Sequence, residues 1–146
     1  MIQAEASTTI RRSIHEVFSF VSDPRKEPAW HADVTEAAPV GAGPIGMGRR
    51  IDYRFRFMGR DTTSIGEVVA FESPRLESIR FAGGPLGMQP TITFRLVPLG
   101  GSVRFTRIVA VEPAGLGRLL EPLLRGYVAR RNAMFVENLR RRLEGA

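Results

Sequence analysis

The sequence predicts an α+β fold in which the helices are segregated from an antiparallel sheet. From residue 50 to residue 111, apolar and polar side chains alternate in successive short segments that are separated by turns rich in Gly and Pro. This is the pattern of half-buried antiparallel strands. Two short helical segments precede these strands and one long helical segment follows them. Helices grouped outside a run of strands define the α+β class.

The composition is that of a globular protein. The 146 residues are 43% hydrophobic and 25% charged, and we expect a single domain over 1–146. No apolar run reaches the roughly 18–20 residues of a membrane span, and residues 1–5 lack the pattern of a signal peptide. We therefore expect a cytoplasmic protein without integral membrane association. The absence of cysteine excludes disulfides and thiolate metal sites.

The chain is basic, with a formal net charge of +6, and Lys26 is the only lysine among its 21 basic residues. This charge would suit binding to a nucleic acid or to an anionic membrane surface. It would also result from a genome biased toward arginine codons, with the arginines on a solvated surface. The arginines are spread along the chain and are not interleaved with exposed aromatic residues, as single-strand binding requires. We expect no nucleic-acid partner.

The first strand is expected over 5–10, and two short helices follow it. Ser13 and Glu16 form a capping box at the start of the first helix. The second helix is expected over 24–30, where Pro28 weakens its middle. From residue 34 onward the chain changes to strands and turns.

Six strands are expected in this part of the chain, and the clearest covers 50–57. Its apolar residues Ile51, Tyr53, Phe55 and Phe57 share one face, and charged residues occupy the other. The later strands are expected over 62–71, 75–81, 91–97 and 103–111. The segment 39–48 lacks the Gly-Lys-Ser/Thr ending of a phosphate loop, so we interpret it as a connection. The loop 82–88 is expected to expose Leu86 and Met88.

The long helical segment, 115–143, has a broad apolar stripe at three- and four-residue steps. The stripe contains two neighbouring series, Leu116, Leu120, Leu123, Tyr127 and Met134, and Leu124, Val128, Phe135 and Leu139. A stripe of this width needs a large apolar partner surface, which the sheet would supply. Pro122 lies inside the pattern and either delays the regular helix or kinks it.

The order and spacing of several segments resemble the START-like (SRPBCC) superfamily of helix-grip proteins, and within it the polyketide cyclase/dehydrase-like proteins. The segments that carry the resemblance are 14–23, Trp30, 46–48, 71–75, 100–103 and the helix 115–143. The resemblance implies a seven-stranded antiparallel curved sheet that is wrapped around the long C-terminal helix, with a deep apolar cavity between them. It also places three connections, 57–60, 82–89 and 112–117, around one end of that cavity.

The cavity is the candidate ligand site. The alternation along the strands and the helix stripe predict its lining, although aromatic residues at this spacing also fill ordinary cores. The expected ligand-binding residues are Trp30, Tyr53, Phe55, Phe57, Phe81, Phe94, Phe105, Arg107, Leu123, Tyr127 and Met134. No metal and no cofactor is expected, because the two histidines and the scattered acidic residues form no metal-ligand pattern.

Two charged residues, Glu67 and Arg107, occupy the expected inward phase of apolar strands. A buried charge needs a partner or water. Arg107 would anchor an anionic or carbonyl-bearing ligand, with Glu67 as its partner or as a general acid or base. The alternative is a bulge that reverses the phase, or exposure at the rim. Tyr127 is a further catalytic candidate, because a tyrosine in the pocket can polarise a carbonyl.

His31 and Asp33 are two positions apart, so the carboxylate could orient the imidazole for acid–base work; we expect the alternative, a surface turn. Three functions remain open. The first is binding of a hydrophobic small molecule, such as a lipid or polyketide, in the cavity. The second is a cyclase, aromatase or dehydratase acting on a ligand in the same cavity. The third is an interaction module, and the sequence also allows a homodimer.

Overall fold

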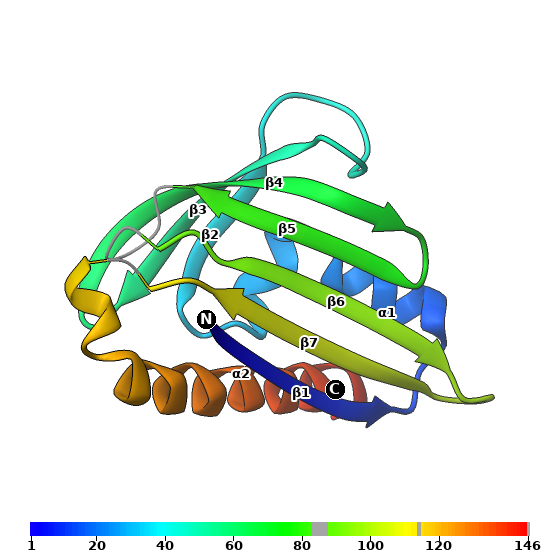
Figure 1. Cartoon of the computed structure of the whole chain (residues 1–146). Helices are drawn as coiled ribbons and strands as arrows, with labels where there is room; N and C mark the ends of the chain where they lie inside the picture. Colours follow the sequence, from blue (N-terminus) through cyan, green and yellow to red (C-terminus); the bar gives the residue numbers. More distant parts are fainter. Residues whose placement is uncertain (83–87, 114, 146) are drawn as a thin grey trace.

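The computed structural model describes residues 1–82, 88–113 and 115–145 and confirms the predicted α+β fold (Figure 1). Its strands are β1 (Ile2–Ile10), β2 (Val34–Pro39), β3 (Arg50–Phe57), β4 (Arg60–Glu72), β5 (Leu76–Ala82), β6 (Thr91–Pro98) and β7 (Val103–Val111). Its helices are α1 (Ile14–Val21), α2 (Glu121–Glu144) and the two 3₁₀ segments η1 (Pro24–Ala29) and η3 (Gly115–Arg118).

The strands form one antiparallel sheet in the order β1-β7-β6-β5-β4-β3-β2. The sheet curves around α2, which runs along β1 and β7 (Figure 1). This is the helix-grip arrangement that the resemblance implies. None of the helices in the described part of the chain is long and apolar enough to cross a membrane.

The N-terminal helices follow the predicted boundaries closely. The Ser13 hydroxyl accepts a hydrogen bond from the Glu16 backbone N–H at 3.2 Å, as a capping box requires. The second helix is a short 3₁₀ segment and not an α-helix, and Pro28 lies inside it. Proline lacks the N–H that an α-helix interior needs, which explains why this segment is not an α-helix.

The long helix α2 begins later than its apolar pattern. Pro122 lies in the first turn of α2, where its missing N–H costs nothing. It therefore delays the helix and does not kink it. The fully buried face contains Leu124, Asn132, Phe135, Val136 and Leu139. In the other predicted series Leu120 and Leu123 are exposed and Tyr127 and Met134 are half-buried, because α2 is rotated so that the polar Asn132 faces inward.

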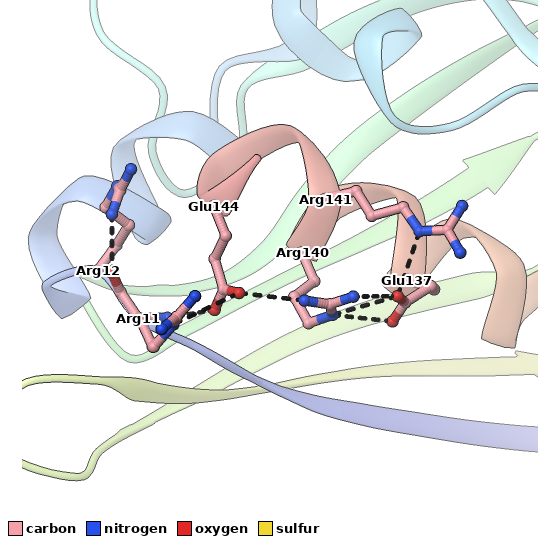
Figure 2. A network of polar contacts seen from close by, with 6 residues as sticks. All are labelled: Arg11, Arg12, Glu137, Arg140, Arg141 and Glu144. Carbon is pink, nitrogen blue, oxygen red and sulfur yellow. Dashed lines mark hydrogen bonds and ion pairs between the residues drawn. The ribbon is translucent and has the colours of Figure 1, made fainter. Parts of the chain in front are cut away.

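An ion-pair network joins the C-terminal end of α2 to the end of β1 (Figure 2). Glu144 accepts a hydrogen bond from the Arg11 backbone N–H at 2.7 Å and pairs with Nη1 of Arg140 at 3.1 Å. Glu137 binds both Arg140 and Arg141, the latter at 3.3 Å. The Arg11–Glu144 contact therefore ties the last turn of α2 to the end of β1, and the other pairs lie within the helix.

The loop before β6 differs from the prediction at one described residue. Met88 is buried and packs with Ile2, Val111 and Leu124, so the prediction that it is exposed is wrong. Leu86 lies outside the described residues.

Candidate functional site

A cavity of about 150 Å³ lies between the concave face of the sheet and α2. Most of its wall is aromatic or aliphatic. The apolar lining residues are Phe55, Phe57, Ile79, Phe81, Met88, Pro90, Ile92, Phe94, Val109, Val111, Val128 and Phe135. The polar lining residues are Glu27, His31, Asp33, Tyr53, Arg56, Ser64, Arg107, Tyr127, Arg131 and Asn132.

The structure places seven of the eleven expected ligand-binding residues on this wall: Tyr53, Phe55, Phe57, Phe81, Phe94, Arg107 and Tyr127. The other four lie elsewhere. Trp30 and Phe105 are buried in the main core, and Met134 is half-buried against it. Leu123 is 73% exposed, because it lies on the outward side of α2.

Arg107 is the central charged residue of the cavity. It is 4% exposed, and its Nη1 donates a hydrogen bond to Oδ1 of Asn132 at 2.7 Å. The Asn132 amide in turn donates to the Arg107 backbone carbonyl at 3.0 Å. The guanidinium also lies over the Phe135 ring, 5.4 Å from its centroid. Its Nε has no hydrogen-bond partner among the described residues, so it retains capacity to bind an acceptor.

Glu27 and Tyr53 are close enough to Arg107 to affect its ionisation. Burial raises the pKa of Glu27 to about 7, although the charge of Arg107 and the Tyr53 hydroxyl oppose this shift. Burial lowers the pKa of Arg107 to about 10, and the charge of Glu27 opposes this shift. The pKa of Tyr53 is raised well above its usual range by burial and then by the charge of Glu27. At neutral pH the site therefore holds a cation, a neutral phenol and a partly protonated carboxyl group.

A second buried acid, Glu77, lies near this group without lining the cavity. It is 1% exposed, and neither carboxyl oxygen has a hydrogen-bond partner among the described residues. Burial, and to a smaller extent the charge of Glu27, raises its pKa to about 8. Glu77 is therefore mostly protonated at neutral pH, since an unpaired buried carboxylate is costly.

His31 is buried, so the expectation of a surface turn is wrong. Its ring stacks on Phe135 with a centroid distance of 3.8 Å, and its Nδ1 accepts a hydrogen bond from the Asp33 backbone N–H at 3.3 Å. Burial and then the charge of Arg107 lower the pKa of His31 well below its usual value. The Asp33 carboxylate binds Arg131 across the edge of the cavity, with 3.2 Å between Oδ2 and Nε. His31 is therefore a neutral wall residue that the Asp33 carboxylate does not orient.

Glu67 does not enter the cavity, and its predicted pairing with Arg107 is wrong. It is exposed on the outer face of the sheet, opposite Arg50 and Arg80. The inward residues of β4 are Ser64, Gly66 and Val68. A Cβ at Gly66 would lie 2.8 Å from Cγ2 of Ile79, so large neighbours require a glycine here. Because two of the inward residues of β4 are small, the hydrophobic alternation along this strand did not indicate which face is buried.

The sequence interpretation missed Glu27, Glu77 and Asn132. Glu77 had a usable signal, because it shares the two-residue alternation of Ile79 and Phe81. Asn132 occupies the helical phase of Val128 and Phe135, which also could have been noticed. Glu27 lies in the Pro-flanked η1 segment, where no periodicity indicates which side chains are buried.

The comparisons agree with this architecture. The sequence model of a family described as "Polyketide cyclase / dehydrase and lipid transport" matches residues 1–144. Comparison with curated proteins yields no match. Among solved structures, TTHA0849 from Thermus thermophilus is 16% identical, with a TM-score of 0.80 and coverage of 97% of this chain and 96% of that chain.

Two further solved structures share the fold. A START superfamily protein from Mycobacterium smegmatis is 18% identical, with a TM-score of 0.69 and coverage of 95% of this chain and 99% of that chain. The di-domain ARO/CYC BexL from the BE-7585A biosynthetic pathway is 14% identical, with a TM-score of 0.72 and coverage of 95% of this chain and 46% of that chain. At these identities the likeness is one of fold.

Proposed function

Because the chain belongs to the polyketide cyclase/dehydrase and lipid transport family, we propose that it binds a hydrophobic small molecule in the cavity between the sheet and α2. The observation that carries the proposal is the mainly apolar wall around Arg107, whose Nε has no partner among the described residues. Concave apolar sites with a few polar groups are typical of small-molecule binding.

The volume and the polar groups narrow the ligand class. An apolar cavity of about 150 Å³ accommodates a benzene-sized molecule, so one ring fits inside and a longer ligand extends through the opening. The Nε of the Arg107 guanidinium lacks a hydrogen-bond partner within the described residues. A ligand oxygen would satisfy this donor, since an unmet buried donor is costly. The expected ligand is an aromatic or alicyclic compound with a carbonyl group.

A binding experiment with two matched probes tests this proposal. Acetophenone has the carbonyl, and ethylbenzene is its hydrocarbon analogue. We expect acetophenone to bind more tightly in NMR titrations, with shifts at the cavity residues. Arg107→Met should weaken acetophenone binding by roughly 10–100-fold, the loss of one hydrogen bond to a charged group, and should leave ethylbenzene binding nearly unchanged.

The matched control is Arg104→Met, on the outer face of the same strand. It should change neither affinity. Equal binding of the two probes to the wild-type protein and to Arg107→Met would contradict the role of Arg107. Failure of both probes to perturb any cavity residue would contradict the proposed function itself.

A second candidate function is an acid–base reaction on the bound ligand. The observation that favours it is Glu27, a cavity carboxyl group whose pKa is raised by burial to about 7. A group that titrates near the working pH is suited to both donating and accepting a proton. With Arg107 on a ligand carbonyl, Glu27 would remove a proton from the adjacent carbon, which is the step that cyclisation and dehydration share.

Exchange of the acetophenone methyl protons in D₂O measures this step directly. We expect the protein to accelerate exchange, with the rate rising as pH increases through about 7 because the ionised carboxylate is the base. Glu27→Gln should slow the catalysed exchange by roughly 10²-fold or more while acetophenone still binds. Unchanged exchange in Glu27→Gln would exclude Glu27 as the base and would leave the binding proposal intact.

A further inference from the structure

Large apolar side chains are exposed next to the cavity-lining residues Phe57 and Tyr127. Met58 is 62% exposed, and on the segment that enters α2 Leu119 and Leu123 are 79% and 73% exposed. Leu120 is also exposed. Contiguous apolar exposure of this kind marks an interaction site more often than scattered single residues do. We call these four residues the mouth patch.

One contact, together with the sequence neighbours of its two residues, places the mouth patch beside the cavity. Phe57 and Tyr127 both line the cavity, and their rings meet edge-on with 5.9 Å between centroids. Met58 directly follows Phe57, and Leu123 lies one helical turn before Tyr127. Figure 1 shows the β3–β4 turn, η3 and the start of α2 at the same end of the molecule. The patch therefore lies beside the end of the cavity that Phe57 and Tyr127 line.

The charges beside the patch are mainly positive. Arg125 pairs with Glu121 at 3.3 Å, and the N-terminal amine pairs with Glu121 and Glu112. Arg60 and Arg118 form no ion pair with any carboxylate of the described residues. These two arginines flank the apolar side chains, one at the start of β4 and one in η3.

We propose that this end of the protein docks on the surface of an anionic lipid bilayer. The leucine and methionine side chains would enter the boundary between headgroups and acyl chains, as the apolar side of an interfacial helix does. Arg60 and Arg118 would remain among the phosphates, to which basic residues are attracted. The flanking positive charge favours an anionic lipid surface over an uncharged apolar partner.

Docking in this orientation turns the end of the cavity that Phe57 and Tyr127 line toward the acyl layer. An apolar ligand then passes between bilayer and cavity without crossing water, which avoids the cost of hydrating its apolar surface. This passage rests on the proposed function. The docking itself does not, because the patch and its arginines lie outside the cavity.

Co-sedimentation with vesicles of phosphatidylcholine, with and without phosphatidylglycerol, tests the docking. We expect binding to the anionic vesicles that weakens as salt is added. The double substitution Leu119→Ser/Leu123→Ser should weaken it at least tenfold, because two large apolar groups no longer enter the bilayer. Arg60→Gln/Arg118→Gln should weaken it several-fold on anionic vesicles only.

The matched control is Val97→Ser/Leu99→Ser. These residues are 46% and 50% exposed, but they lie at the β6–β7 hairpin, at the opposite end of the sheet (Figure 1). An equal loss of vesicle binding in Val97→Ser/Leu99→Ser would overturn the proposal, and so would the absence of wild-type binding to anionic vesicles. So would self-association of the free protein that disappears in Leu119→Ser/Leu123→Ser, since a second copy would then cover the patch. Acetophenone titration of the same variants, without vesicles, reports separately on the cavity.

Discussion

Replacing Asn132 with leucine should lower the free energy of unfolding by about 3–5 kcal/mol, the cost of removing one partner from a buried charge. The Asn132 side chain accepts from Nη1 of Arg107 and donates to the Arg107 backbone carbonyl. Leucine has a similar size but can do neither, so the guanidinium would remain buried with fewer partners. Urea denaturation followed by circular dichroism measures the change.

A double-mutant cycle separates this pairing from simple packing. Arg107→Met/Asn132→Leu replaces both polar partners with apolar side chains and should recover most of the lost stability. Ala133→Leu, at an exposed neighbouring position on α2, is the control and should be nearly neutral. Strictly additive losses in the double variant would show that Arg107 and Asn132 do not stabilise each other.

Replacing Glu77 with glutamine should make the protein more stable at alkaline pH, by on the order of 3–5 kcal/mol. Burial raises the folded-state pKa of Glu77 to about 8, well above that of an exposed glutamate. The folded protein therefore holds this proton more tightly than the unfolded chain. The stability it contributes is complete at low pH and is lost as the pH rises toward and through about 8.

The wild-type protein and Glu77→Gln should thus have similar stability at about pH 4 and should diverge as the pH increases to about 8.5. Thermal denaturation across this range measures the difference. Glu67→Gln, an exposed carboxyl group on the outer face of β4, should follow the wild-type curve. A Glu77→Gln curve parallel to the wild type at every pH would contradict the buried, protonated state of Glu77.

Much of the architecture could be predicted because its signals are periodic and local. The alternation of Ile51, Tyr53, Phe55 and Phe57 identified β3 and its inner face, and Ser13 with Glu16 identified the start of α1. The inward position of Arg107 also followed from the alternation along β7. In each case neighbours in the sequence decide which way a side chain points.

The polar part of the site was harder to predict, because its members lie far apart in the chain and each is unfavourable alone. Arg107 comes from β7 and Asn132 from α2, and each is acceptable inside only because the other is there. Glu27 is buried by the course of η1 beneath the sheet, which no local pattern reports. The exposure of Leu123 could not be predicted, because either of two apolar series on α2 could form its inner face. Only the rotation of the helix in the fold selects between them.

The network in Figure 2 has a mechanical consequence for the cavity. It holds the last turns of α2, where Phe135, Val136 and Leu139 are also buried. At the other end of the helix Leu124 is buried, but Leu123 is largely exposed. We therefore expect a ligand longer than one ring to displace the first turns of α2 before the last ones.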